Sequence, residues 1–212
     1  MRTLQVAQLQ AALIAAGGLI IESEPLLTEL DTAIGDGDHG ISMRAGFSAL
    51  REALGNNQYE DIYALMRDAG LTLVKTMGGA SGVIFGTLFI AGYEGVRGRR
   101  DMDADALIAF FEAGAASIAK RGRTEPGDKT MLDALLPAVE AMRQQRLETD
   151  DAGLVLQAAY AGALQGVENT KAMISRKGRS KNFREKTLGL PDPGAISLSL
   201  IFKGISDSVN GL

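Results

Sequence analysis

Apolar residues recur three or four positions apart through most of this sequence, and this spacing most constrains how the chain can fold. It runs from Leu4 to Ile20 and again from Leu107 to Ile118. Such residues share one face of an α-helix, whereas a half-buried strand needs strict alternation. No stretch alternates for long enough to require a sheet. The sequence therefore predicts an all-α fold, with helices at 4–23, 41–55, 59–77, 81–97, 103–121, 129–146, 151–172 and 195–209.

A single helical domain over residues 1–212 is expected, because no repeat of solenoid period and no linker rich in Pro or Ser divides the chain. The 18 residues from Thr76 to Tyr93 carry no charge, which is close to the length of a membrane span. Five glycines lower the hydrophobicity of this run, and no flanking basic cluster accompanies it. We interpret it as a buried central helix and expect no membrane association.

The charge and cysteine content exclude several classes of function. The net charge is −4 and the pI is near 5.1, which argues against nucleic-acid binding through a broad basic surface. The chain has no Cys, so disulfides, thiolate metal sites and cysteine nucleophiles are excluded. It also lacks the G-x-S-x-G pattern of a nucleophilic serine. No secretory signal is recognisable at the N-terminus, and a cytoplasmic location is the expectation.

Three carboxylates lie within eight residues of a glycine-punctuated segment, at Asp31, Asp36 and Asp38. Like charges this close need a neutralising cation. Hard ions such as Mg²⁺ bind carboxylate oxygens and complete their shell with water and substrate phosphates. The pattern therefore indicates a site for one or two metal ions and favours phosphoryl chemistry. In the alternative interpretation, Asp31 closes a helix, Asp36 and Asp38 occupy turn positions, and His39 caps the next helix.

Residues 35–40 also match looser patterns, which we discount. The dinucleotide fingerprint G-x-G-x-x-G needs a preceding strand, and the P-loop needs a lysine where this chain has Ile41. An EF-hand counted from Asp36 would place Gly40 where an oxygen ligand belongs. A helix beginning near Gly40 would nevertheless point its positive end at a bound phosphate.

Three further segments are candidate parts of the same site. Residues 78–82 form a glycine cluster, which is either a tight turn or a nucleotide contact, and residues 121–130 form a polar loop. Residues 174–194 hold six Lys or Arg between positions 176 and 186, with Glu185 as the one acidic residue among them. Loops this long are usually functional or disordered. The segment is either a solvated surface or a lid that neutralises phosphate.

Five blocks of this sequence resemble, in the same order, the nucleotide-binding L subunits of bacterial dihydroxyacetone kinases. The blocks are Leu30-Asp31 with residues 34–40, then residues 78–82, 125–131, 176–179 and 192–195. The resemblance implies a barrel of eight antiparallel amphipathic helices with the nucleotide bound at one end. It also implies that ADP or ATP and two Mg²⁺ ions are the cofactors.

The resemblance carries site residues over to this sequence. The metal ligands that it implies are Asp31, Asp36 and Asp38. The nucleotide contacts that it implies are His39, Gly40, Ile41, Ser42, Ala80, Ser81, Gly122, Met131, Arg179, Asp192, Pro193 and Gly194.

The implied partners are a separate K subunit, which holds dihydroxyacetone, and a phosphohistidine protein of the phosphoenolpyruvate-dependent phosphotransferase system (the M subunit). In one branch of the family this M subunit rephosphorylates bound ADP. In the other branch, ATP is an exchangeable cosubstrate. Two alternatives stay open: a kinase subunit for another small ketose such as erythrulose, and a non-catalytic module that senses nucleotide.

Overall fold

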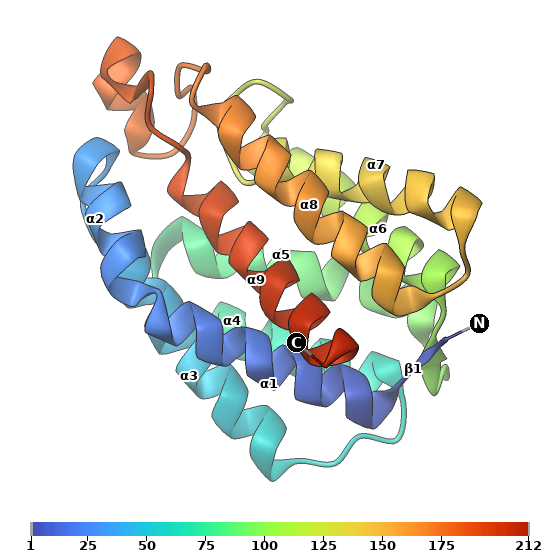
Figure 1. Ribbon diagram of the computed structural model, residues 1–212. Coiled ribbons are helices and arrows are strands. Elements are labelled where there is room, and N and C mark those ends of the chain that lie inside the picture. Colours follow the sequence, from blue (N-terminus) through green and yellow to red (C-terminus); the bar gives the residue numbers. More distant parts are fainter. Residues whose placement is uncertain (1, 212) are drawn as a thin grey trace.

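The computed structural model describes residues 2–211, and at residue 94 the backbone only. It confirms the all-α prediction (Figure 1). The α-helices within that range are α1 (Val6–Glu22), α2 (Glu24–Ile34), α3 (His39–Asn56), α4 (Ile62–Thr76), α5 (Gly79–Tyr93), α6 (Ala104–Gly122), α7 (Leu132–Glu148), α8 (Ala152–Thr170) and α9 (Pro193–Asn210). Eight of them match the predicted helices, with ends displaced by four residues or fewer.

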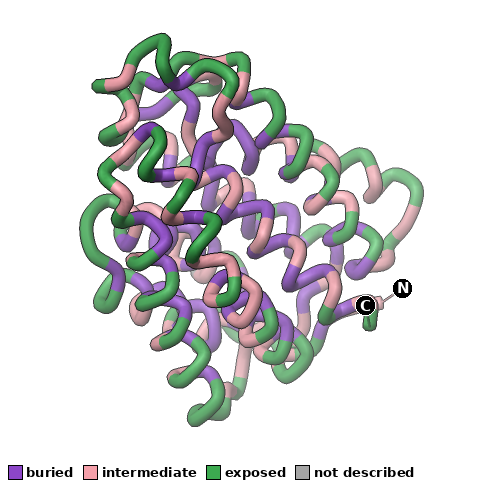
Figure 2. Tube along the Cα trace, turned by 60° about the vertical axis from the view of Figure 1, so that its left-hand side comes forward, coloured by how far each residue is buried: buried purple, intermediate pink, exposed green. Residues whose placement is uncertain are grey.

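Eight helices pack in a closed ring. Each of α3 to α8 packs on the next helix in the chain, and α1 packs on both α3 and α9. Buried apolar side chains from these helices merge into one core. Figure 2 shows buried and exposed positions interspersed along each helix, as expected when one face of the helix lies on a shared core.

Aspartates set the start of four of these helices. In each case a side-chain oxygen accepts a hydrogen bond from a backbone N–H two or three residues further on, which satisfies an otherwise unpaired donor. The capping residues are Asp61, Asp103, Asp151 and Asp192. The caps at Asp103 and Asp151 confirm the helix starts that the sequence places there.

The uncharged run forms the buried helix α5, as predicted. Close packing of α5 on α4 explains two of its glycines: a Cβ at Gly86 would lie 3.0 Å from the carbonyl oxygen of Gly70, and one at Gly70 would lie 3.1 Å from that of Gly86. Within residues 2–211 no single helix is both long enough and apolar enough to cross a membrane. As a pair, α1 and α2 would reach that length and composition, although they meet at a bend of 58°.

Three predictions about local structure were wrong. Helix α2 was not expected between the predicted helices at 4–23 and 41–55. It carries Asp31 in its last turn, and the link from α2 to α3 is only residues 35–38. The first helix begins at Val6 and not at residue 4, because Leu4–Gln5 (β1) pairs antiparallel with Asp101–Met102 (β2). The fourth predicted helix ends at Tyr93 and is followed by a 3-10 turn, η1 (Glu94–Val96).

The segment at 174–194 is also more ordered than a plain loop. Its last two residues belong to α9, and it contains a 3-10 helix, η2 (Ser180–Thr187). We call residues 174–192 the basic loop. In Figure 1 it lies beside α2 at one end of the molecule, and η2 contacts α2.

Candidate functional site

A cavity of about 340 Å³ opens at the end of the ring that the basic loop covers. Four helices begin at its wall: His39 opens α3, Gly79 opens α5, Met131 precedes α7, and Asp192 caps α9. The first turn of a helix exposes unpaired N–H groups and carries partial positive charge. Four such ends around one cavity favour an anion there once a cation neutralises the aspartates at its edge.

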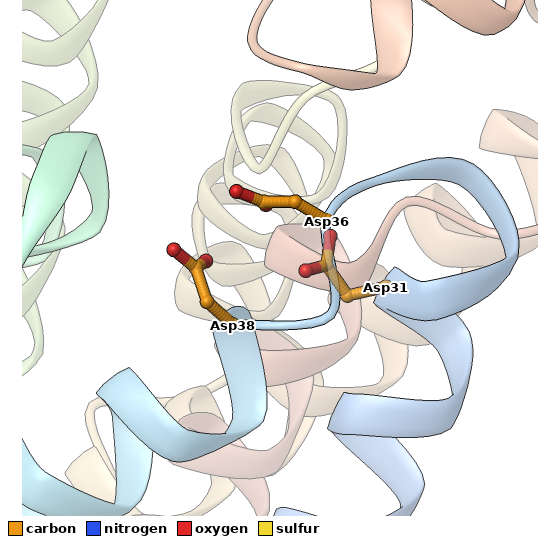
Figure 3. A group of neighbouring side chains, drawn as sticks. All are labelled: Asp31, Asp36 and Asp38. Carbon is orange, nitrogen blue, oxygen red and sulfur yellow. The ribbon is translucent and has the colours of Figure 1, made fainter.

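The three aspartates meet at the edge of this cavity (Figure 3). Asp31 comes from the last turn of α2 and is buried, whereas Asp36 and Asp38 are exposed on the short link to α3. One carboxylate oxygen from each lies within 4.8 Å of the other two. Three carboxylate oxygens therefore face one small space, and an all-oxygen donor set suits a hard cation such as Mg²⁺. The side chains that the sequence singles out are therefore brought together.

The local backbone holds Asp31 in place. It also excludes the dinucleotide fingerprint and the P-loop. One carboxylate oxygen of Asp31 accepts a hydrogen bond from the N–H of His39 at 3.2 Å, which ties the end of α2 to the start of α3. The segment before Gly35 is helical. The dinucleotide fingerprint and the P-loop, which both follow a strand, are therefore excluded here.

His39 joins three helices beneath the aspartates. Its Nε2 lies 2.8 Å from the Ser197 hydroxyl of α9, and its Nδ1 lies 3.4 Å from the Ser81 hydroxyl of α5. Burial lowers the pKa of His39, although the nearby Asp31 and Asp38 act in the opposite direction. The imidazole of His39 is therefore neutral at pH 7 and forms part of the cavity wall.

Nine of the twelve predicted nucleotide contacts line the cavity: His39, Ala80, Ser81, Gly122, Met131, Arg179, Asp192, Pro193 and Gly194. The other three, Gly40, Ile41 and Ser42, do not line the cavity. Gly40 is buried against α2, Ile41 is 61% exposed, and the hydroxyl of Ser42 donates to the carbonyl of Gly78 at 3.4 Å.

The sequence missed an apolar part of the wall, formed by Ile84, Phe85 and Ile118. A signal existed for two of them, because Ile84 and Phe85 follow Ser81 by three and four residues and so share its side of the helix. Helix α5 is apolar all round, so sequence alone does not reveal which face lines a cavity. The cavity is also lined by residues of the three candidate segments that were not named as individual contacts: Gly78, Gly79, Thr124, Lys129, Thr130, Lys177, Gly178 and Ser180.

The basic loop reaches the aspartates through Arg179, whose Nε lies 2.8 Å from a carboxylate oxygen of Asp36. Lys177 lies 3.5 Å from the carboxylate of Asp128 in the loop at 123–131. Burial acts to raise the pKa of Asp128, but the N–H of Glu125 and the ammonium of Lys177 together bring that pKa below its ordinary value. Asp128 is therefore ionised and holds the loop at 123–131 to the basic loop.

Asp192 is the most perturbed acid at the cavity. Burial raises its pKa to about 7, and the carboxylate of Asp133 adds to this rise. The N–H of Ala195 and the ammonium of Lys129 oppose it. The folded protein therefore retains a proton on Asp192 at pH values where the unfolded chain has lost it.

This shift predicts a stability difference that depends on pH. The contribution of Asp192 to the free energy of unfolding should be complete below about pH 4 and lost as the pH rises to about 7. The Asp192→Asn variant keeps a capping side chain but cannot titrate. Between about pH 5 and 8, the difference in unfolding free energy between wild type and variant should change by about 2 kcal/mol, measured by urea unfolding. Asp151→Asn, at the equivalent cap of α8, is the control, and the same pH slope in both variants would contradict the assignment.

Comparison with known proteins gives a consistent result. Residues 33–207 match the family model described as the DAK2 domain. The chain is 37% identical over 187 residues to the ADP-binding subunit DhaL of the PEP-dependent dihydroxyacetone kinase of Escherichia coli K12, covering 88% of this chain and 89% of that one. It is 40% identical over 186 residues to the ADP-binding subunit DhaL of PEP-dependent dihydroxyacetone kinase 1 of Listeria innocua, covering 88% of each.

A solved structure is similar over nearly the whole length. The dihydroxyacetone kinase of C. freundii, in complex with AMP-PNP and Mg²⁺, superposes with a TM-score of 0.75 at 27% identity. The match covers 98% of this chain and 35% of that one, so this chain spans about a third of the C. freundii kinase.

Proposed function

The chain belongs to the DAK2 domain family, and from this membership we propose that it is the ADP-binding subunit of a dihydroxyacetone kinase. One observation carries the proposal: three aspartates and four helix N-termini meet at a single cavity. This arrangement suits a magnesium-bound diphosphate. The printed names of the E. coli and L. innocua relatives, which describe ADP-binding subunits, support it.

In this proposal Asp31, Asp36 and Asp38 hold two Mg²⁺ ions against the diphosphate. The bound ions would supply charge neutralisation and hold phosphate oxygens in line for transfer. The protein contributes a fixed geometry, because Asp31 is anchored by the N–H of His39. The first turns of α3, α5, α7 and α9 add N–H donors for phosphate oxygens.

The remaining walls suit the other parts of a nucleotide. Ile84, Phe85, Ile118 and Met131 provide an apolar surface for a purine ring. Arg179 pairs with Asp36 and can pair with phosphate instead, because its side chain is 72% exposed and a surface ion pair is weak. A planar guanidinium matches phosphate oxygens well. Phosphoryl transfer needs this kind of positioning more than covalent work by the protein.

We place the acceptor site on a partner. Dihydroxyacetone would be held by a separate K subunit that docks over the cavity, and the transferred group would come from the bound nucleotide. ADP would then remain in place and be rephosphorylated by a phosphohistidine protein, the M subunit. The description of both bacterial relatives as PEP-dependent, together with their similar length, favours this donor over free ATP.

The first test is to denature the purified protein and identify any released nucleotide by chromatography and mass spectrometry. About one ADP per chain is expected if the nucleotide is a resident cofactor. Release of no nucleotide, with full activity on added ATP, would instead support the ATP-dependent branch.

The second test is transfer of labelled phosphate in a reconstituted mixture of this chain, a K subunit and a phosphohistidine donor. Label should reach dihydroxyacetone only when the K subunit is present. Preferential labelling of erythrulose would assign a different ketose to the partner. Tight nucleotide binding without transfer to either sugar would indicate a nucleotide-sensing module.

A further inference from the structure

Lys129 is a buried cation that the proposed function leaves without a role. It lies in the loop at 123–131, and only 1% of its surface is exposed. Its backbone has a φ of 61°, a left-handed conformation that is unfavourable for a residue with a side chain. Such a conformation persists only where surrounding contacts hold it.

The ammonium of Lys129 is saturated by backbone carbonyls. It donates to the carbonyl of Met173 at 3.1 Å, to that of Leu190 at 2.6 Å, and to that of Thr187. An ammonium has three N–H donors, so these bonds use all of them. Although Lys129 lines the cavity, it therefore has no donor left for a phosphate.

These carbonyls come from both ends of the basic loop. Met173 directly precedes the loop, whereas Thr187 and Leu190 stand near its end. The two ends are also joined by other bonds: the N–H of Ser175 donates to the hydroxyl of Thr187 at 3.0 Å, and the N–H of Gly189 donates to the carbonyl of Lys171 at 2.8 Å. We call this region, residues 171–175 and 187–190, the neck of the basic loop.

The contacts at the tip of the basic loop are weaker than those at its neck. Arg179 pairs with Asp36 at 2.8 Å, but its side chain is 72% exposed, and exposed ion pairs stabilise little. The buried ammonium of Lys129 makes charge-assisted hydrogen bonds, which are roughly twice as strong as neutral ones. The position of Arg179 therefore depends on the neck, together with the contacts of Arg176 and Lys177 with Asp128.

We propose that Lys129 is a positioning residue whose ammonium clamps the two ends of the basic loop together and so holds Arg179 over the three aspartates. Its effect on nucleotide release rests on the proposed function, whereas its effect on the neck does not. A shorter or uncharged side chain would leave the partly buried carbonyls of Met173 and Leu190 without this donor, and the carbonyl of Thr187 with only the N–H of Leu190, and so allow the neck to open. Arginine would not substitute fully, because its planar donors do not converge on three carbonyls around one atom.

The test compares Lys129→Met with Lys171→Met. The control removes a lysine from the same region, but Lys171 points outward and pairs with Glu168 at the surface. Hydrogen exchange of the ligand-free proteins reports on the neck through the amides of Ser175 and Gly189. The rate at which a fluorescent ADP analogue bound with Mg²⁺ is released reports on the basic loop. Far-UV circular dichroism checks that each variant is folded.

In Lys129→Met the neck amides should exchange about tenfold faster or more, and the analogue should leave about tenfold to a hundredfold faster. Lys171→Met should match wild type in both measurements. Wild-type exchange rates at the neck of a folded Lys129→Met protein would overturn the proposal, as would unchanged release. If wild type itself fails to bind the analogue, the proposed function fails, and the exchange result still decides the role of Lys129.

A second variant covers the case in which Lys129→Met does not fold. Thr187→Val removes the hydroxyl that accepts from Ser175 and leaves the lysine in place. The Ser175 amide should exchange faster, and the ADP analogue should be released faster, each by about threefold to tenfold. If the neck amides exchange faster but the ADP analogue is released at the wild-type rate, the neck does not control the basic loop. That result would also overturn the proposal.

Discussion

Asp36→Asn is expected to lower the Mg²⁺-dependent affinity for ADP by about a hundredfold or more, while the helical fold remains intact. The substitution preserves shape but removes one of the three charges that hold the proposed cation. A neutral amide binds a hard divalent ion more weakly than a carboxylate does. A hundredfold loss corresponds to about 2.7 kcal/mol of binding free energy. The side chain is 36% exposed, so the free energy of unfolding should change little. Titration calorimetry with ADP, with and without Mg²⁺, measures the effect.

A second variant separates loss of the proposed metal from loss of the ion pair with the basic loop, because Asp36 pairs with Arg179 and is also assigned to the metal. Arg179→Gln removes the ion pair and the proposed phosphate contact of Arg179, and leaves the three carboxylates. It should weaken ADP binding moderately and keep the dependence on Mg²⁺, whereas Asp36→Asn should lose that dependence. Wild-type affinity for ADP and Mg²⁺ in Asp36→Asn would refute the metal assignment.

Most helices were predictable because their buried residues are apolar and recur at helical spacing. Helix α2 was missed because its inward stripe of Leu27, Asp31 and Ile34 contains a carboxylate. A buried aspartate reads as a break in an apolar pattern, yet here it occupies the core-facing position so that its carboxylate reaches the cavity. The functional residue Asp31 therefore interrupts the apolar pattern by which α2 would have been predicted.

The site also has parts that were predictable from the sequence and parts that were not. The aspartates lie close together in the sequence, so their meeting was predictable from local spacing. Lys129 was not assigned a role, because its partners lie 44 to 61 residues further along the chain. The partners are backbone carbonyls, which leave no signature in the side-chain pattern. Contacts of this kind depend on how the loops pack, and only the three-dimensional structure reveals them.

Gly40 has a structural role that the motif alone did not reveal. The resemblance implies that it contacts nucleotide, and the structure places it where α3 crosses α2. A Cβ at this position would stand 2.2 Å from the hydroxyl oxygen of Thr28 and 2.5 Å from the carbonyl oxygen of Glu24. The hydroxyl can rotate away, whereas the backbone carbonyl cannot. Any side chain at this position therefore pushes the two helices apart.

Gly40→Ala should consequently damage both stability and binding. We expect the free energy of unfolding to fall by about 1–3 kcal/mol, because an added methyl group overpacks a rigid contact. The separation of α2 from α3 also displaces Asp31 from the N–H of His39, so the affinity for ADP and Mg²⁺ should fall about tenfold or more. Urea unfolding and calorimetry measure the two effects.

Gly55→Ala provides the matched control on the same helix. A Cβ at Gly55 meets no atom within 4 Å, so alanine should stabilise α3 by about 0.5–1 kcal/mol and leave ADP binding unchanged. Opposite signs at two glycines of one helix would locate the effect in the contact with α2 and not in helix propensity. If Gly40→Ala binds ADP and Mg²⁺ as wild type does, the spacing of α2 and α3 does not set the geometry of the aspartates. The cluster would then have to be held by the link at residues 35–38 alone.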